Sequence, residues 1–248
     1  MAETKKTSAR GTRLRTIELW YKPVFDVHLN MAIDFYGKIQ INDKSIGIMQ
    51  PEIFVPVAEK SNQICELEKW AVEEACDAMK RCAERDADIN SVILWTSLKH
   101  LKKKTFLPAM QKILKEKEVS SEKFCFYITE NILPADAAVI AENIKAVRDA
   151  GFEIAIDDFG VEYSSLTNLG QYDVDYIGIH GSLVTDILTD ERTQNMIQGI
   201  IDFCKKLNTR VMVGGIDSPE KAEMLKKMGV DRLAGSLYGD FIKEKSIG

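Results

Sequence analysis

Strand-like and helix-like patterns alternate along most of this chain, from residue 89 to its end. Short apolar runs, such as Ser91–Trp95, each precede a segment whose apolar residues recur at helical spacing, such as Thr105–Val119. Repeated strand–helix units favour a parallel sheet, and about eight of them in roughly 250 residues favour a closed α/β barrel. A doubly wound open sheet is the alternative fold. The predicted strands of this part are 91–95, 124–130, 152–157, 174–179, 210–214 and 232–235.

The N-terminal part has a different pattern. Thr16–Asp26 and Met31–Ile41 read as two strands joined by a short turn, and Pro51–Arg85 reads as a helix with one break. No linker rich in Pro, Gly or Ser divides the chain. We therefore expect one barrel domain over residues 16–248, preceded by a flexible basic tail over residues 1–15.

Composition excludes several classes of protein. The formal net charge of -5 gives no support for a nucleic-acid partner. No apolar run approaches the roughly 18–20 residues that a membrane span needs, and the basic first residues lack the apolar core of a secretory signal. We expect a cytoplasmic protein. Its cysteines form no CxxC pair, so we expect reduced packing residues at Cys65, Cys76, Cys82, Cys125 and Cys204.

Two adjacent carboxylates, Asp157 and Asp158, end the predicted strand that begins at Phe152. Adjacent acids at the end of a buried strand cost free energy unless a metal, a Lys or Arg, or a substrate meets them. In a barrel the active site collects at the carboxyl ends of the strands. The residues expected there are Glu130, Asp157, Asp158, Gly178–His180, Gly214, Gly215, Ala234 and Gly235.

The segment Ala155–Gly160, followed by Tyr163–Leu166, resembles the EAL domain family, bacterial phosphodiesterases that hydrolyse cyclic di-GMP. Further matches keep the family's order and spacing over about residues 17–240. The resemblance implies a modified (β/α)₈ barrel whose first strand runs antiparallel to the others. The further matches are Tyr21–Pro23, Pro51–Glu59, Ile128–Glu130 and Gly215–Asp217.

The resemblance also implies a site with two divalent metals, Mg²⁺ or Mn²⁺, held by oxygen ligands. Three of the family's acids are kept, at Glu130, Asp157 and Asp158. Other family positions are substituted. Met31 stands for the signature Glu, Phe35 for a phosphate-binding Arg, Trp95 for an Asn, Gly178 for a Lys, His180 for an acid, Gly214 for a catalytic Glu, Ala234 for a Gln and Lys22 for a Gln.

These substitutions oppose catalysis. A Met thioether is a poor ligand for a hard ion, Trp offers no oxygen, and Gly offers no side chain. We therefore expect no catalytic residue, no bound cofactor and no hydrolysis of cyclic di-GMP. Two alternatives stay open for the remaining acids: a residual single-metal site from Glu130, Asp157 and His180, or acids satisfied by hydrogen bonds. Lys22 could also neutralise Asp157 or Asp158 directly.

Three function classes remain. The first is a non-enzymatic regulatory module of bacterial signalling that acts through an unidentified protein partner, with a homodimer as one possibility. The second is a cyclic di-GMP receptor that binds without hydrolysis, and the third is an active phosphodiesterase. Met31 and Trp95 would narrow the barrel mouth, and Phe35 and Tyr36 could stack a base. The basic run 99–104 is expected to form a solvated face.

Overall fold

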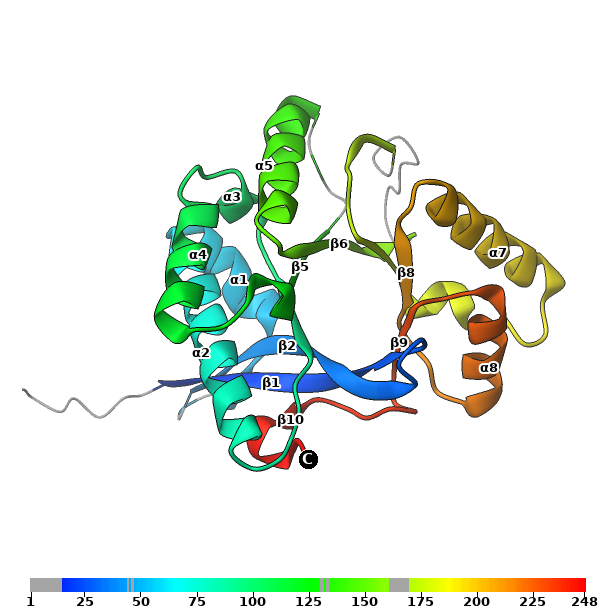
Figure 1. Cartoon of the computed structure of the whole chain (residues 1–248), viewed down its shortest axis with the longest axis horizontal. Coiled ribbons are helices and arrows are strands. Elements are labelled where there is room, and N and C mark those ends of the chain that lie inside the picture. The colour runs from blue at the N-terminus through cyan, green and yellow to red at the C-terminus, as the bar shows by residue number, and fades with distance from the viewer. Residues whose placement is uncertain (1–14, 44, 46, 130–131, 133, 161–169) are drawn as a thin grey trace, which may run out of the picture.

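The computed structural model describes residues 15–43, 45, 47–129, 132, 134–160 and 170–248. Within these ranges ten strands form one sheet in the order β10-β1-β9-β8-β7-β6-β5-β4-β2-β3, and β1 also pairs with β2. That pairing closes eight of the strands into a barrel, with β3 and β10 at its margins (Figure 1). The strands are β1 Arg15–Asp26, β2 Met31–Asp43, β3 Gly47–Met49, β4 Ser91–Trp95, β5 Phe124–Thr129, β6 Glu153–Phe159, β7 Tyr176–Ile179, β8 Arg210–Val213, β9 Arg232–Ala234 and β10 Ile242–Lys243.

The first strand runs antiparallel to both of its barrel neighbours. β1 forms a hairpin with β2, where Leu19 lies opposite Ile39, and it pairs with β9, where Phe25 lies opposite Leu233. The strands from β2 and β4 to β9 are parallel to one another. The predicted barrel with an antiparallel first strand is confirmed, and the open doubly wound sheet is excluded.

Helices surround the barrel (Figure 1). None of the helices within the described ranges is long and apolar enough to cross a membrane. The motif match Tyr163–Leu166 and all but the last residue of the predicted tail, 1–15, lie outside the described residues. The helices are α1 Pro51–Lys60, α2 Ile64–Ala83, α3 Leu98–Leu101, α4 Phe106–Lys117, α5 Ala137–Asp149, α7 Glu191–Lys206 and α8 Pro219–Met228, with 3₁₀ turns η1 Ser121–Lys123, η2 Pro134–Asp136, η3 Gly181–Val184 and η4 Glu244–Ser246.

Local signals set the ends of α8. The Ser218 hydroxyl accepts a hydrogen bond from the Lys221 backbone N–H, and Pro219 occupies the first turn, where its missing N–H costs nothing. The helix ends at Gly229, whose φ of 92° lies in the left-handed region that glycine adopts without strain. The sequence therefore predicts both ends of this helix.

Apolar side chains fill both the interior of the barrel and the layer between strands and helices. Strand residues alternate between the two, because successive side chains point to opposite faces. All five cysteines are buried and free, which agrees with packing roles. The interior layer consists of Val24, Ile93, Cys125, Ala155, Tyr176, Met212 and Ala234.

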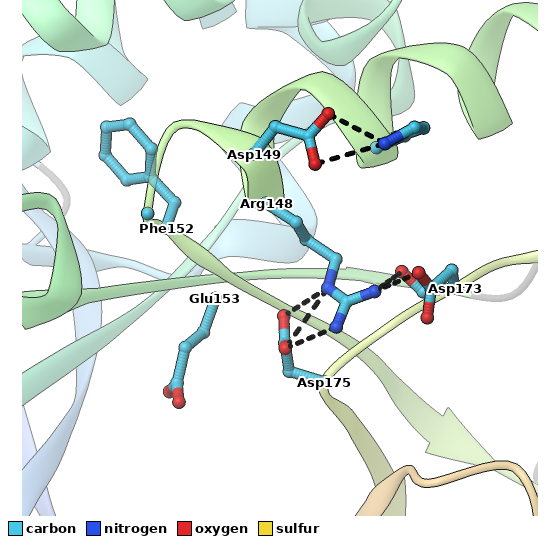
Figure 2. A pocket seen from close by; sticks show the side chains of 8 residues that line it. Arg148, Asp149, Phe152, Glu153, Asp173 and Asp175 are labelled. Carbon is cyan, nitrogen blue, oxygen red and sulfur yellow. Dashed lines mark hydrogen bonds and ion pairs between the residues drawn. The ribbon is translucent and has the colours of Figure 1, made fainter.

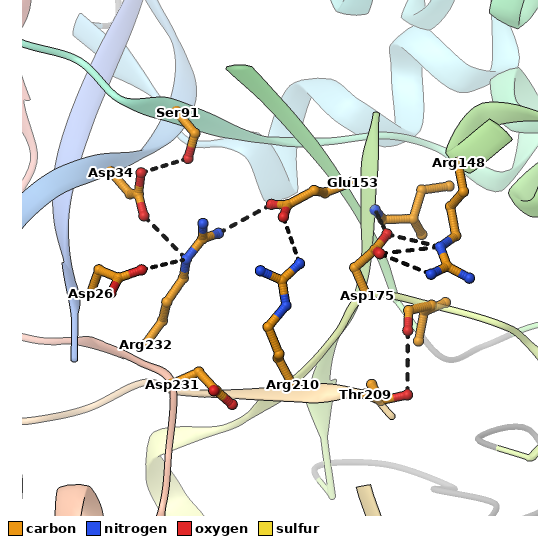
Figure 3. Close-up of polar contacts among 12 residues, drawn as sticks. Asp26, Asp34, Ser91, Arg148, Glu153, Asp175, Thr209, Arg210, Asp231 and Arg232 are labelled. Atoms are coloured by element: carbon orange, nitrogen blue, oxygen red, sulfur yellow. Dashed lines mark hydrogen bonds and ion pairs between the residues drawn. The ribbon is translucent and has the colours of Figure 1, made fainter. Parts of the chain in front are cut away.

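Charged side chains close the end of the barrel at which the parallel strands begin (Figure 3). Arg232 Nε lies 3.1 Å from Asp34 Oδ2, and Asp34 has no exposed surface. Glu153 joins the two arginines, 2.6 Å from Arg210 Nη2 and 3.5 Å from Arg232 Nη1. Both guanidinium groups also lie against the ring of Tyr176, at 3.9 Å and 4.4 Å. We call this group the base cluster.

The basic run 99–104 does not form the expected solvated face. His100 is buried, with Nδ1 2.8 Å from Glu68 Oε2, and Glu68 also accepts hydrogen bonds from Thr96 Oγ1 and the Ser97 N–H. Lys102 pairs with a carboxylate of η2, and Lys103 contacts a thiol of α2. The contacts of His100 and Lys103 connect this run to α2. The residues of the run alone do not indicate that a buried acid of α2 lies beside it.

Candidate functional site

The acid pair lies on a bulge near the end of β6. Ile156 pairs with Ile177 and Phe159 with Ile179, so β6 has one residue more than β7 between these pairs. The backbone accommodates the additional residue at Asp158, whose φ of 59° lies in the left-handed region. A bulge re-aims the side chains around it. Asp157 is consequently half-buried while Asp158 is exposed, and the strand continues two residues beyond its predicted end.

The Asp157 carboxylate is held by its own surroundings. Oδ1 accepts a hydrogen bond from the Asp158 N–H at 2.9 Å, and Oδ2 accepts one from the Tyr36 hydroxyl at 3.3 Å. A Cβ added to Gly178 would lie 1.9 Å from Asp157 Oδ1. The carboxylate therefore occupies the space that a side chain at position 178 would need.

Electrostatics at this site favour protonated groups. Burial, together with the neighbouring charge of Asp158, raises the pKa of Asp157 to about 6, although the two hydrogen bonds act in the opposite direction. Burial also raises the pKa of Tyr36 well above its ordinary value, and the charge of Asp157 adds to this. Tyr127, edge-on to Tyr36 at 5.8 Å, is shifted in the same direction by burial. Both phenols are neutral at physiological pH.

Met31 does not belong to this site, contrary to the sequence-based expectation. It is the first residue of β2, it pairs with Asp26, and it is 54% exposed. That end of β2 is the end opposite to Asp157, because β2 runs parallel to β6 in the barrel. The side chain that β2 presents to Asp157 is Tyr36. The register of the β1–β2 hairpin decides which residue of β2 faces Asp157.

Phe35 also lies elsewhere. Its side chain is buried on the helix side of the barrel and meets Tyr21 edge-on at 6.4 Å, so it cannot stack a base at the mouth. Trp95 is the last residue of β4 and packs against Ala58 and Ile64, beneath α1. It therefore fills a satellite core.

The glycines at the ends of β7 and β8 differ in their surroundings. A Cβ on Gly214 would meet nothing closer than 3.8 Å, whereas one on Gly215 would lie 2.6 Å from the Gly181 backbone. Gly215 and Gly181 therefore allow two backbone segments to touch. Ala234 is buried in the apolar interior layer of the barrel.

Within the described ranges the remaining predicted residues form no hydrogen bond or ion pair with the acid pair, although the charge of His180 acts to lower the pKa of Asp157. His180 is exposed, and its Nδ1 accepts from the Ser182 N–H at 3.2 Å, so it caps η3. Lys22 Nζ lies 5.9 Å from the centroid of the Phe241 ring. In the part of the chain that the structure describes, Lys22 forms no ion pair with Asp157 or Asp158. Glu130 lies outside the described residues.

The described residues do not fit a two-metal centre. Across the described ranges no group of three or more His, Cys, Asp or Glu side chains is placed to hold a metal ion. Asp157, the inward acid, already accepts hydrogen bonds from the Tyr36 hydroxyl and the Asp158 N–H. A hard divalent ion needs several ionised or carbonyl oxygens that converge. No catalytic step through a metal follows from these residues.

A polar hollow of about 420 Å³ lies between α5 and the segment that leads into β7 (Figure 2). Arg148 pairs with Asp175 at 3.0 Å and with Asp173, and Lys145 pairs with Asp149 at 2.8 Å. The cations that line the hollow are thus paired with acids that also line it. These ion pairs connect α5 to the segment before β7, so their role is structural.

The closed barrel with an antiparallel first strand, and an acid pair near the carboxyl end of β6, places the chain in a class of modified α/β-barrel domains. Residues 7–240 match the EAL domain family, and the chain belongs to that family. Two curated relatives are named cyclic di-GMP phosphodiesterases. PA2567 of Pseudomonas aeruginosa is 24% identical over 234 residues, and PdeR of Escherichia coli is 27% identical over 221 residues.

The alignments cover 94% of this chain and 40% of the Pseudomonas protein, and 86% of this chain and 33% of the E. coli protein. The chain thus spans less than half the length of these relatives. Among solved structures, the PaMucR phosphodiesterase in complex with cyclic di-GMP has a TM-score of 0.82 at 21% identity, covering 94% of both chains. The EAL domain of Xanthomonas citri FimX, also in complex with cyclic di-GMP, has a TM-score of 0.78 at 15% identity, covering 92% of this chain and 88% of FimX. These likenesses establish the fold.

Proposed function

We propose that this chain is a regulatory domain of cyclic di-GMP signalling that does not hydrolyse the dinucleotide and acts through contacts with another protein. The observation that carries the proposal is the placement of Asp157, whose carboxylate rests on Gly178 and accepts a hydrogen bond from Tyr36. Two-metal hydrolysis needs ionised carboxylates that point at shared ions. Here the inward carboxylate accepts hydrogen bonds from the Tyr36 hydroxyl and the Asp158 N–H.

The neighbouring positions support the same proposal. Tyr36 supplies a neutral phenol where β2 meets Asp157, and Gly178 and Gly214 supply no side chain at the ends of β7 and β8. Removing a catalytic group commonly lowers the rate by orders of magnitude. Where several groups act as a unit, removing one of them costs about as much as removing all.

Hydrolysis is tested by incubating the purified protein with cyclic di-GMP and Mg²⁺ or Mn²⁺ and separating the products by chromatography. We expect no linear dinucleotide, while an active family member, assayed in parallel, converts the substrate. Turnover by this protein that disappears in the Asp157→Asn variant would overturn the proposal, because it would place Asp157 in a working catalytic centre.

Protein contact is supported by exposed apolar side chains on the outer surface. Ile53 and Val57 of α1 are 58% and 64% exposed and border an apolar groove of about 690 Å³ between α1, α2 and the β1–β3 strands. Exposed apolar patches on soluble proteins commonly mark contact surfaces. Affinity capture from the native cell, with wild-type protein and the Val57→Asp variant, tests this. We expect a partner that the variant fails to retain, and capture of no specific partner would contradict it.

The second candidate is a receptor that binds cyclic di-GMP without hydrolysis. Lys22 of β1 and Lys38 of β2 favour it, because neither lysine forms an ion pair with a carboxylate within the described ranges. The oligomeric state stays a prediction, and light scattering on the purified chain would distinguish a monomer from a homodimer.

A further inference from the structure

Helix α1 presents one exposed face along its whole length. Its exposed residues recur at helical spacing and lie in one stripe, while Phe54 and Ala58 on the opposite face are buried. Ile53 and Val57 are 58% and 64% exposed, more than any other large apolar side chain of the described ranges. Apolar side chains so placed favour a contact that removes them from water. We call this face the α1 stripe, and it consists of Glu52, Ile53, Pro56, Val57 and Lys60.

The apolar groove of about 690 Å³ runs beside the α1 stripe. Its floor is a row of side chains on three neighbouring strands, in which Ile17 lies opposite Ile41 and Ile41 lies opposite Met49. Leu67 and Trp70 of α2 line it as well. The surface thus carries an apolar ridge and an apolar hollow side by side. These are the two halves that a self-complementary contact between identical copies requires.

The charges of the stripe have opposite signs at its two ends. Glu52 lies in the first turn of α1 and Lys60 in the last, and neither forms an ion pair within the described ranges. On the α2 side of the groove, Glu66 and Lys69 pair with each other at 2.6 Å. A two-fold axis that crosses the middle of the stripe at right angles makes two copies of α1 antiparallel, so each Glu52 meets the Lys60 of the other copy. A partner helix of a single charge sign would match only one end, so the pattern favours a second copy.

We propose that the α1 stripe and the groove beside it form the interface of a homodimer. The stripes of the two copies pack antiparallel, and Ile53 and Val57 of each copy enter the groove of the other. Burial of these apolar side chains supplies most of the affinity, and the exposed charge pairs set the register. This homodimer rests on the proposed function, which assigns the surface to protein contact, and it identifies the partner there as a second copy of the chain.

Sedimentation equilibrium of the full chain over about 1–500 μM measures the dissociation constant of the dimer. We expect wild type to associate within this range, and Val57→Asp to raise the dissociation constant about tenfold or more, because a carboxylate would be buried at the contact. Val139→Asp is the matched control, since Val139 is 44% exposed on α5, outside the stripe, and this variant should associate as wild type does. Thermal melting of each variant at low concentration checks that the fold is kept.

Exchange of charges tests the antiparallel register. Glu52→Lys and Lys60→Glu each place like charges at both ends of the contact, so each variant alone should dimerise about threefold more weakly, or worse, at low ionic strength. The two variants have complementary stripes, so in an equimolar mixture they should associate with each other more tightly than either does with itself. A mixture no tighter than the single variants would overturn the proposal.

Cross-linking locates the two-fold axis. In Pro56→Cys the new thiols of the two copies face each other across the axis, and the five native cysteines are buried. Mild oxidation should give a disulfide-linked dimer, which Val139→Cys should not give. A wild-type dimer whose Pro56→Cys form does not cross-link would use another surface and would overturn the proposal.

The homodimer is also excluded if wild type stays monomeric at about 500 μM, or if Val57→Asp and Val139→Asp weaken association equally. The proposed function can survive that result. If affinity capture retains a different protein that Val57→Asp loses, the surface contacts that protein and not a second copy.

Discussion

At the scale of single residues, burial and the neighbouring charge of Asp158 raise the pKa of Asp157. Its pKa in the folded chain is about 6, above the value of 3.8 for an unburied Asp. The folded state therefore binds this proton more tightly than the unfolded state does. Stability from this group is fully present below about pH 4 and is lost as the pH rises to about 6.

We expect the Asp157→Asn variant to be more stable than wild type at pH 7.5, by up to about 3 kcal/mol. The amide keeps an acceptor for the Asp158 N–H and removes the charge that burial penalises. The difference should fall below about 1 kcal/mol at pH 4 and vanish near pH 3, where wild-type Asp157 is protonated in both states. Urea unfolding at pH 4, 5, 6 and 7.5 measures it, and a difference independent of pH would contradict the assignment.

A second residue-scale prediction contrasts two glycines. In Gly178→Ala the new methyl group would lie 1.9 Å from Asp157 Oδ1 and 3.2 Å from the Asp157 Cα. The carboxylate must leave its place, so we expect a cost of about 1–3 kcal/mol in the free energy of unfolding. Gly214→Ala is the control, because its Cβ has no neighbour within 3.8 Å, and we expect a change within about 0.5 kcal/mol. Equal effects in urea unfolding would contradict the close contact.

At the scale of elements, α2 and the end of β4 are joined through one buried carboxylate. Glu68 accepts from Thr96 Oγ1 at 2.7 Å and from the Ser97 N–H at 3.0 Å, and lies 2.8 Å from His100 Nδ1. Glu68→Gln turns an acceptor into a donor inside this network, so we expect a loss of about 1–3 kcal/mol. Glu66→Gln on the exposed face of the same helix should change stability by less than about 0.5 kcal/mol. Chemical denaturation compares the two.

Most elements were predictable from the sequence because their signals are short-range. Caps, glycines at helix ends and apolar periodicity lie within a few residues of one another, as at Ser218 and Gly229. The register between strands is not a short-range property. A difference of five positions along β2 separates exposed Met31 from Tyr36 at the acid pair, and only the pairing of β1 with β2 distinguishes them.

The candidate site was predictable in part for the same reason. The acid pair and the glycines at the strand ends lie where the sequence predicts, because each directly follows a recognisable strand. The bulge at Asp158 and the hydrogen bond from Tyr36 depend on backbone conformation and contacts between distant strands.

At the scale of the whole molecule, the base cluster holds the start of the barrel together. Arg232→Met would leave Asp34 charged and fully buried, so we expect a loss of about 3–5 kcal/mol. The double variant Arg232→Met/Asp34→Asn removes that charge and should recover part of the loss. A double-mutant cycle by urea unfolding should give a coupling of about 1–3 kcal/mol, and additive effects would contradict a direct ion pair.

Between the base cluster and the mouth lies the apolar layer around Cys125 and Ala155. This layer separates the charges that stabilise the barrel from those that a ligand or metal would meet. Substitutions at the mouth therefore leave the anchoring charges untouched. The residues at the mouth can therefore change while the base cluster continues to stabilise the barrel. The apolar layer thus makes the domain tolerant of functional change.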